Sequence, residues 1–264
     1  MPLLDLRTVT ATRYVTPLRE GGSLPAIVEA DDDGLYVLKF RGAGQGPKAL
    51  IAELVAGEIG RALGLPVPEI VLVELDPVLG RAEPDEEVQD LVKASAGLNL
   101  ALDYLPGSLA FTPAAKPPPD PALASAVVWF DAYVTNVDRT PRNTNLLLWH
   151  RRLWLIDHGA ALYVHHAWGD YLARSASPFP QIRDHVLLPF ADAVLAVGAD
   201  LQPRLTHELL TAIVDAIPDT WLLPDPAFAD PDAQRAAYLA YLLARRDASR
   251  AFVEEAVRAR AQLV

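Results

Sequence analysis

The sequence predicts an α+β protein of two lobes, a β-rich N-terminal lobe with one main helix and a mostly helical C-terminal lobe. Short β-forming runs separated by turn residues fill most of residues 9–104, and a helical pattern interrupts them at residues 47–63. Helical patterns dominate from residue 121 onward. A proline-rich connection begins at Pro106, so we expect lobes of residues 1–104 and 105–264.

Composition limits the class of protein. A chain of 264 residues can bury the core of one domain or of two lobes. Its net charge of −11 argues against nucleic acid as the main partner, because phosphate backbones are bound by clustered Lys and Arg. The absence of cysteine excludes disulfides and thiol catalysis. Residues 1–7 do not form a signal peptide, and no apolar run approaches the roughly 18 residues of a membrane span, so we expect a soluble, cytoplasmic protein.

Three β-strands are predicted at the start of the chain, at Val9–Pro17, Pro25–Ala30 and Leu35–Phe40. The run Gly21, Gly22, Ser23 lies between the first two. Glycine lets backbone N–H groups approach an anion closely, so this hairpin is a candidate phosphate cover, and an ordinary turn is the alternative.

Lys39 lies near the end of the third, otherwise apolar strand. A buried ammonium group needs a partner, whereas an ammonium at a solvated strand end needs none. The next element is a helix at Pro47–Leu63, which Gly64 ends. It offers two carboxylates, Glu53 on its polar side and Glu58 on its apolar flank, and helical position favours Glu58 as the buried partner.

The glycine-rich run that precedes this helix, residues 42–48, is not a P-loop. Lys48 follows proline rather than glycine and is followed by alanine rather than Ser or Thr. We predict a flexible connector, with Lys48 as a secondary phosphate contact.

Further elements follow in order. We predict a strand at Pro66–Leu75, a solvated loop at Glu83–Asp90, and a last strand of the first lobe at Gly97–Tyr104. The end of that strand, Leu102, Asp103 and Tyr104, then lies near the hinge. The predicted helices of the second lobe are Pro121–Val134, Gln181–Val197, Pro203–Ile217 and Pro231–Val264.

Two β-forming runs, residues 146–149 and 153–156, flank a polar break at His150-Arg151 and predict a hairpin, although a primed turn prefers Gly or Asn. Antiparallel pairing about this break sets Asn143 level with His158 and one step from Asp157. Opposite residues in such a ladder are about 5 Å apart. An amide oxygen and a carboxylate at that spacing can hold one hard cation between them.

Asp138 precedes Asn143 by five positions. Asp-x-x-x-x-Asn is the spacing of a phosphotransferase catalytic loop, in which the Asp accepts the proton of the attacking hydroxyl and the Asn binds metal together with a second Asp, here Asp157. Asn and Asp around a proline are also ordinary loop residues, which is the alternative. The neighbouring His165 and His166 are not expected to bind metal, because adjacent histidines rarely converge on one ion.

The chain resembles the HipA-like kinase family, which is distantly related to phosphatidylinositol 3- and 4-kinases and to protein kinases. The resemblance runs from about residue 10 to the C-terminal helices, and the catalytic cluster is its specific part. The matching residues are Gly21-Gly22-Ser23, Val37 to Phe40, Glu53 with Gly64-Leu65-Pro66-Val67-Pro68, Asn136 to Arg139 through Asn143, and Asp157-His158-Gly159.

The resemblance implies a protein-kinase-like fold that binds ATP and Mg²⁺. It implies that Lys39 binds the ATP phosphates and that Glu53, rather than Glu58, orients Lys39. It also implies that the glycine turn and the hinge residues lie around the nucleotide. It makes Asp138 the base, and Asn143 and Asp157 the magnesium ligands. His158 stands where protein kinases have Phe, so their activation switch need not apply, and the apparent lack of the extra N-terminal subdomain of HipA toxins puts a toxin role in doubt.

We therefore expect an ATP–Mg²⁺ phosphotransferase that acts on a hydroxyl acceptor, as a HipA-like Ser/Thr protein kinase. The alternatives are a small-molecule or lipid-headgroup kinase and a nucleotide-binding pseudokinase that acts through protein partners. The presence of a base at Asp138 argues against the pseudokinase, because a pure scaffold needs no base. The sequence leaves the acceptor open.

Overall fold

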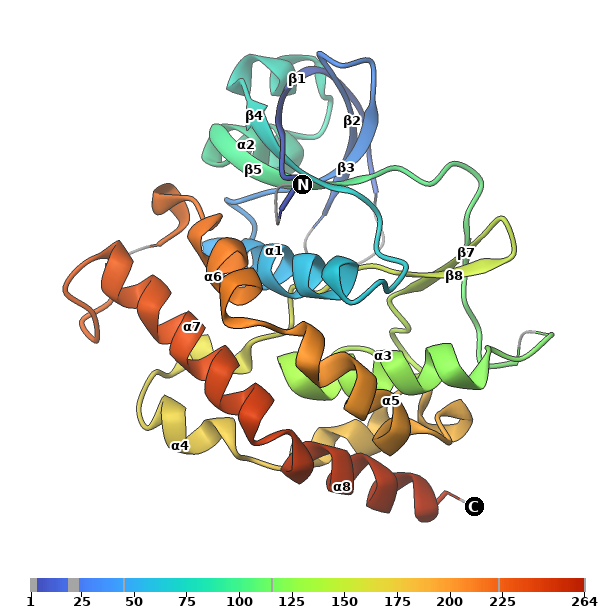
Figure 1. Ribbon diagram of the computed structural model, residues 1–264. Coiled ribbons are helices and arrows are strands. Elements are labelled where there is room, and N and C mark those ends of the chain that lie inside the picture. The colour runs from blue at the N-terminus through green and yellow to red at the C-terminus, as the bar shows by residue number, and fades with distance from the viewer. Residues whose placement is uncertain (1–3, 19–23, 45, 115, 223, 264) are drawn as a thin grey trace.

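The computed structural model describes residues 4–18, 24–44, 46–114, 116–222 and 224–263 of the chain, so the predicted phosphate cover at Gly21, Gly22 and Ser23 lies outside the described residues. The N-terminal strands gather at one end of the molecule and most helices at the other, with helix α1, Gly46–Ala62, between them (Figure 1). The α+β prediction is confirmed.

The N-terminal strands close into a five-stranded barrel of order β1-β2-β3-β5-β4. β1 pairs in parallel with β4, whereas the other pairs are antiparallel. Apolar side chains fill the interior, where Val28, Leu38 and Val73 are fully buried. The strands are β1 Thr8–Pro17, β2 Ala26–Ala30, β3 Leu35–Lys39, β4 Ile70–Leu75 and β5 Gly97–Asp103. The sequence predicted these five strands, but closure depends on the parallel β1–β4 pair, which joins segments far apart in the chain.

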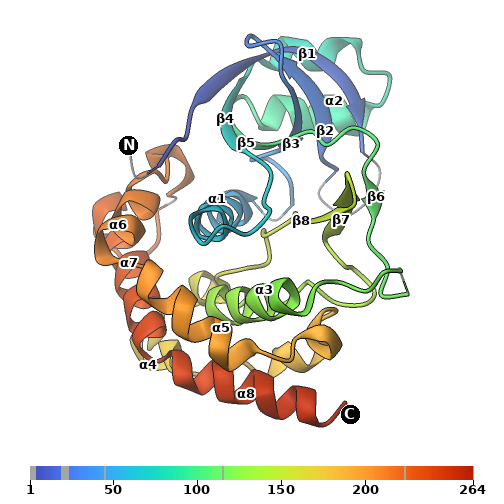
Figure 2. The ribbon, with the colours of Figure 1, turned by 45° about the vertical axis from the view of Figure 1, so that its right-hand side comes forward.

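Helix α1, Gly46–Ala62, runs between the barrel and the C-terminal helices (Figure 2). Every residue from Leu50 to Gly60 is buried, including Glu53 and Glu58. The helix therefore has no broad solvated face in its middle turns. For this reason, position on a helical wheel could not separate its two glutamates.

Glu58 is 4% exposed, and the Nε of Arg61 lies 3.4 Å from one of its carboxyl oxygens. Burial raises the pKa of Glu58 from 4.5 to about 7. The folded protein then holds a proton that the unfolded chain has lost, so stability falls as pH rises from about 4.5 to about 7. We expect Glu58→Gln to abolish this decline and to stabilise the protein at pH 8 by up to about 3 kcal/mol. Urea unfolding of wild type and Glu58→Gln at pH 5 and pH 8 measures the pH dependence and the gain in stability. An equal gain at the two pH values would contradict a raised pKa of Glu58.

The segment predicted as a solvated loop at Glu83–Asp90 is instead largely helical, so that prediction was wrong. A 3₁₀ helix, η1 at Pro77–Ala82, precedes α2 at Glu86–Ala94. The Asp85 side chain caps α2 by accepting a hydrogen bond of 3.1 Å from the N–H of Glu87. Val88 and Val92, four residues apart, bury one side of α2 among the residues that fill the barrel.

Helix α3, Pro121–Val134, is the centre of the helical half, and its bounds match the prediction. Trp129, Phe130 and Tyr133 are fully buried on it. The predicted final helix is divided at Ala248 into α7 and α8. The other α-helices of this half are α4 Tyr171–Ser175, α5 Val194–Leu201, α6 His207–Asp215, α7 Pro231–Asp247 and α8 Ser249–Ala261. Short 3₁₀ helices link them at η2 Tyr163–His166, η3 Pro180–Asp184, η4 Leu188–Phe190, η5 Gln202–Arg204 and η6 Asp219–Trp221.

The predicted hairpin is confirmed. β7, Leu146–Trp149, pairs antiparallel with β8, Arg152–Leu155, and the strands fold back at His150 and Arg151. Both turn residues have left-handed backbones, with φ of 49° and 64°, so a turn with positive φ at both centres forms without Gly or Asn. The short strand β6, Leu109–Ala110, adds to β7 and was not predicted.

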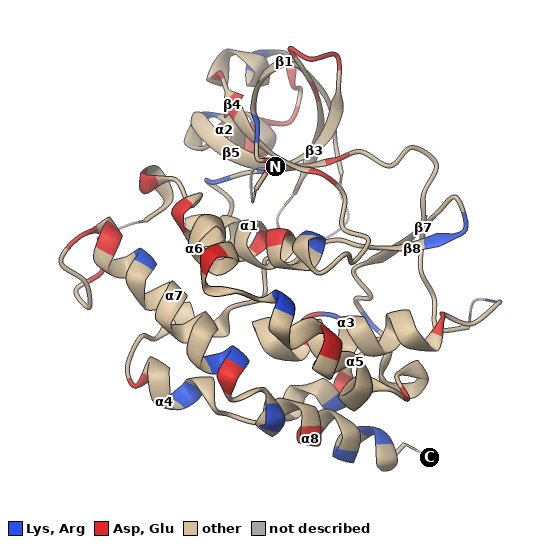
Figure 3. Cartoon of the chain, in the orientation of Figure 1, with Lys and Arg blue, Asp and Glu red and all other residues tan. Residues whose placement is uncertain are grey.

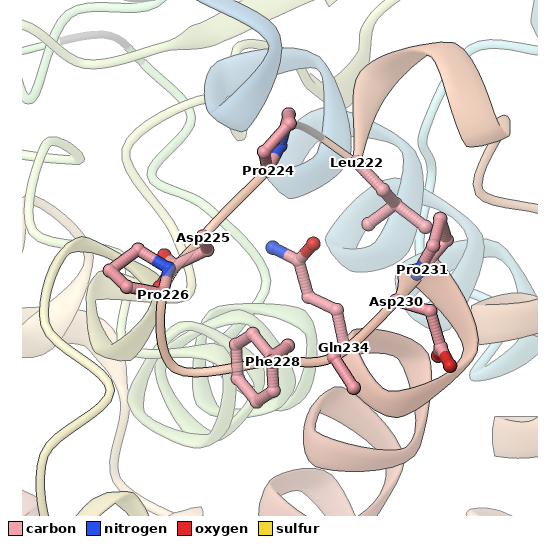
Figure 4. A pocket seen from close by; sticks show the side chains of 9 residues that line it. Leu222, Pro224, Asp225, Pro226, Phe228, Asp230, Pro231 and Gln234 are labelled. Atoms are coloured by element: carbon pink, nitrogen blue, oxygen red, sulfur yellow. The ribbon is translucent and has the colours of Figure 1, made fainter.

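A cavity of about 380 Å³ opens in the loop that precedes α7, and the amide of Gln234 points into it (Figure 4). None of the predicted site residues lines it. Within the described residues, no helix combines the length and apolar character that a membrane crossing requires.

Candidate active site

The ammonium group of Lys39 lies between two carboxylates at the end of β3. Its Nζ donates to Oε2 of Glu53 at 2.5 Å and to Oδ1 of Asp157 at 2.6 Å. Burial alone would lower the pKa of Lys39, but the two negative charges raise it above its ordinary value. Burial alone would likewise raise the pKa of Glu53, but Lys39 and the His158 hydrogen bonds lower it to about 2. Lys39 and Glu53 are therefore both charged at neutral pH.

Of the two glutamates left open by the sequence, Glu53 is the one that contacts Lys39, because it projects from α1 toward β3. His158, in the segment after β8, also holds the Glu53 carboxylate. The backbone N–H of His158 donates to its Oε2 at 2.7 Å, and the Nδ1 of His158 lies 3.2 Å from its Oε1. The His158 ring is fully buried and meets Phe130 edge-on, with 5.8 Å between the ring centroids.

Asp157 has a left-handed backbone, with φ of 56°. This conformation is costly for a residue other than glycine and is concentrated at functional sites. Asp157 lies two residues after the end of β8. Its side chain contacts Lys39, and the next side chain, His158, contacts Glu53, so consecutive residues belong to one cluster.

The catalytic-loop candidates meet through hydrogen bonds. The amide nitrogen of Asn143 donates to Oδ2 of Asp138 at 2.8 Å, and that of Asn145 lies 3.3 Å from the same oxygen. The backbone N–H of Asp138 donates to the side-chain oxygen of Asn136 at 3.1 Å. The half-buried Asp138 carboxylate is thus oriented by amides, and it has no cation within ion-pair distance among the described residues.

Beneath this loop lies a buried charge network that the sequence did not predict as part of the site. Asp131, on α3, accepts from Arg139 Nε at 2.6 Å, from Asn136 at 3.0 Å, and lies 2.9 Å from His185 Nε2. Burial alone would raise the pKa of the Asp131 carboxyl, but Arg139 and His185 hold it below its ordinary range. An aspartate in an otherwise apolar helix, followed eight residues later by an arginine, is the sequence signal that could have indicated this pair.

Arg139 also connects the loop to the hairpin. Its NH1 group donates to the backbone carbonyls of Asn145 and, at 3.3 Å, of Ile156. The N–H of Ile156 donates to the carbonyl of Asn145 at 3.1 Å, in the register that the hairpin predicts. Arg139, the residue after Asp138, thereby contacts Ile156, the residue before Asp157. This contact links the catalytic loop to the cluster of Lys39, Glu53 and Asp157.

Comparison with known proteins identifies the family of this chain. A protein-family model described as HipA-like kinase matches residues 12–255. The chain belongs to the HipA-like kinase family. It is therefore a kinase, and the resemblance stated from the sequence is confirmed. No match was found among curated proteins.

Solved structures support the kinase fold of this HipA-like kinase. The Helicobacter pylori proinflammatory kinase CtkA superposes with a TM-score of 0.57 at 14% identity, over 97% of this chain and 98% of that chain. The Golgi casein kinase with Mn and ADP bound gives a TM-score of 0.53 at 12% identity, over 94% of this chain and 74% of that chain. A further structure of the Golgi casein kinase gives a TM-score of 0.51 at 12% identity, over 94% and 72% of the two chains. At these identities the likeness shows the fold alone.

Three further residues of the HipA-like kinase that were predicted to lie beside the nucleotide are at the end of β5, the strand that pairs with β3. Leu102 is buried in the core, Asp103 is exposed, and the N–H of Tyr104 donates to the carbonyl of Leu35 at 2.9 Å. Lys48, predicted to be a secondary phosphate contact, donates to the carbonyl of His165 at 2.5 Å, so the start of α1 is attached to the segment after Asp157.

The side-chain oxygen atoms of Asp157 and Asn143 suit a hard divalent cation. Asp157 keeps 44% of its side chain exposed beside Lys39, and Asn143 directs its amide nitrogen at Asp138, which leaves its amide oxygen on the other side. In the described part of the chain, no three His, Asp or Glu side chains form a metal-binding group. A cation here would need one carboxylate, one amide oxygen, water and a substrate phosphate, which is how magnesium binds.

Proposed function

We propose that this HipA-like kinase transfers the γ-phosphoryl group of ATP, with Mg²⁺, to the hydroxyl group of Ser or Thr in a protein acceptor. The observation that carries the proposal is the lysine held between Glu53 and Asp157, on the same framework as the amide-oriented Asp138. The Mn and ADP named for the Golgi casein kinase structure support a nucleotide and a divalent cation as ligands of this fold.

In the proposed reaction, Asp138 accepts the proton of the acceptor hydroxyl as its oxygen bonds to the γ-phosphorus. The bond from that phosphorus to the β–γ bridging oxygen breaks, and ADP leaves. Lys39 holds the phosphates by charge, because Glu53 and Asp157 fix its ammonium group in place. Asn143 and Asp157 would hold the metal, which when bound neutralises phosphate charge.

The proposal extends to the rest of the predicted site. We place the boundary between lobes of residues 1–104 and 105–264 directly after the hinge residues Leu102, Asp103 and Tyr104, which would lie beside the nucleotide. The glycine turn at residues 21–23 would cover the phosphates, since it follows β1 and precedes β2 in the same barrel as Lys39.

Transfer of γ-labelled phosphate tests the proposed function. The purified chain is incubated with labelled ATP and magnesium, with and without EDTA, in the presence of a protein mixture, of small alcohols and sugars, or of inositides. We expect EDTA-sensitive label on Ser or Thr of protein. Label only on sugars or inositides would show a small-molecule or lipid-headgroup kinase. Binding of Mg–ATP without transfer to any acceptor would show a nucleotide-binding pseudokinase.

A further inference from the structure

Glu53 is a buried carboxylate on α1 that receives hydrogen bonds from two other segments of the chain. Figure 3 shows acidic residues in the middle turns of this helix. Its Oε2 accepts from Lys39 Nζ at 2.5 Å and from the backbone N–H of His158 at 2.7 Å, and its Oε1 lies 3.2 Å from the Nδ1 of His158. Among the described residues, His158 therefore supplies every hydrogen bond to Glu53 except that of Lys39.

The side-chain contact assigns the tautomer of the His158 ring. Glu53 is ionised at neutral pH, so its Oε1 can only accept a hydrogen bond. Nδ1 must then carry the proton that it donates to Oε1. The other ring nitrogen, Nε2, is buried and has no hydrogen-bond partner within the described residues. The hydrogen bonding of this ring is thus directed at Glu53.

Packing fixes the His158 ring in this orientation. The ring is fully buried and lies edge-on to Phe130. The α1 backbone passes close to it at Gly57, one turn beyond Glu53, where an added Cβ would lie 4.0 Å from Nδ1 and only 2.5 Å from Ile70. A Phe ring at position 158, as in protein kinases, would donate nothing to Glu53.

Asp157, the other carboxylate on Lys39, has a second proposed role. Its Oδ1 accepts from Lys39 Nζ at 2.6 Å, and the same side chain, 44% exposed, is a proposed metal ligand. An ammonium group and a divalent cation at one carboxylate compete for its negative charge. When Asp157 serves as a metal ligand, Lys39 therefore depends more on the fully buried Glu53.

We propose that His158 is a positioning residue, which holds Glu53, and through it Lys39, in place for the nucleotide phosphates while Asp157 serves as a metal ligand. A hydrogen bond at this position takes over from the apolar contact that a Phe would make. This inference rests on the proposed function, because it requires Lys39 to hold nucleotide phosphates.

Nucleotide affinity in two variants of similar size tests the inference. His158→Leu removes the ring N–H, whereas His158→Asn keeps an N–H donor near the place of Nδ1. Calorimetry on the full chain measures the Kd of a non-hydrolysable ATP analogue with magnesium. We expect His158→Leu to weaken binding by about tenfold or more, and His158→Asn by no more than about threefold. Wild-type affinity in His158→Leu, or equal losses in the two variants, would overturn the inference.

Two further titrations separate positioning from a general structural defect. Adenosine has no phosphate, so its Kd should change by less than about twofold in His158→Leu. Without magnesium, Asp157 stays on Lys39, so the loss for the ATP analogue should shrink to about threefold or less. Equal losses for adenosine and the ATP analogue would overturn the inference, and so would a loss that is the same with and without magnesium.

His165→Leu is the matched control. His165 is also a fully buried histidine, and its Nδ1 lies 3.1 Å from the hydroxyl oxygen of Tyr238, so its ring makes its hydrogen bond outside the lysine cluster. This variant should lower the melting temperature but keep the wild-type ratio of the affinities for the ATP analogue and adenosine. The same change of this ratio in both leucine variants would overturn the inference.

The tautomer provides a readout that needs neither ligand nor activity. In the full chain with ¹⁵N-labelled histidine, NMR should show the His158 proton on Nδ1 and none on Nε2, and the spectrum of His158→Asn identifies the signals. A proton on Nε2 alone would overturn the inference. If the tautomer and the binding results hold but no acceptor is phosphorylated, the phosphotransferase proposal fails and the inference stands. Phosphoryl transfer with a nucleotide affinity that does not depend on His158 would overturn the inference alone.

Discussion

Replacing Asp138 by Asn will reduce phosphoryl transfer by about 10²- to 10⁴-fold, the range that general-base catalysis supplies. The substitution removes the only group in the loop that can take the hydroxyl proton, yet an amide oxygen still accepts the hydrogen bonds that Asn143 and Asn145 donate to Asp138. The loop should therefore keep its conformation. The loss should appear in kcat, because the substitution leaves Lys39, the proposed phosphate contact, with both of its carboxylate partners.

The measurement is steady-state transfer to the acceptor found for wild type, together with nucleotide affinity by calorimetry. Asp200→Asn is the control, because Asp200 is exposed near the end of α5 and far from the loop in sequence. Wild-type kcat in Asp138→Asn would remove Asp138 from the mechanism. A parallel loss of nucleotide affinity and melting temperature would point to a structural defect instead.

Replacing Arg139 by Met will destabilise the protein by about 3–5 kcal/mol, the cost of removing one partner of a buried ion pair. Arg139 is 1% exposed and Asp131 is fully buried, so the carboxylate would keep only His185 and Asn136 as partners. The backbone carbonyl of Ile156 would also lose the Arg139 donor, and that of Asn145 would keep the N–H of Ile156 but lose Arg139. Both effects act at the joint between the catalytic loop and the hairpin.

Urea unfolding of the single variant, of Asp131→Asn and of the double variant measures the coupling. We expect the double variant to regain part of the loss, because no unpaired charge then remains buried. If the losses of unfolding free energy in Arg139→Met and Asp131→Asn simply added in the double variant, a direct Arg139–Asp131 pair would be contradicted. Arg142→Met is the control, since Arg142 is exposed in the same loop and should change stability by no more than about 0.5 kcal/mol.

Local patterns were sufficient to predict much of the fold. Alternating β-forming runs predicted all five barrel strands, and apolar periodicity with a starting proline predicted α1 and α3 closely. The hairpin followed from two short runs and a polar break, and its register brought residues 145 and 156 together as expected. These features depend on neighbours in sequence, where pattern and structure are directly linked.

What the sequence could not predict depends on contacts between distant segments. Barrel closure needs the β1–β4 pair. Helical position favoured Glu58, because the pairing depends on which side of a fully buried helix faces β3, and only the family resemblance indicated Glu53. The Asp131–Arg139–His185 network joins residues 8 and 54 positions apart. His185 alone carries no sign of this role, because a histidine before an apolar run is equally suited to a core or a surface.

The enclosure of α1 has a consequence for control of the enzyme. A helix surrounded along its middle turns cannot swing outward or rotate without exposing a large apolar area, so the Lys39–Glu53 pair should persist whether or not nucleotide is bound. Amide hydrogens in its middle turns should exchange only through global unfolding. We therefore expect any on–off regulation of this kinase to act elsewhere than on the Lys39–Glu53 pair.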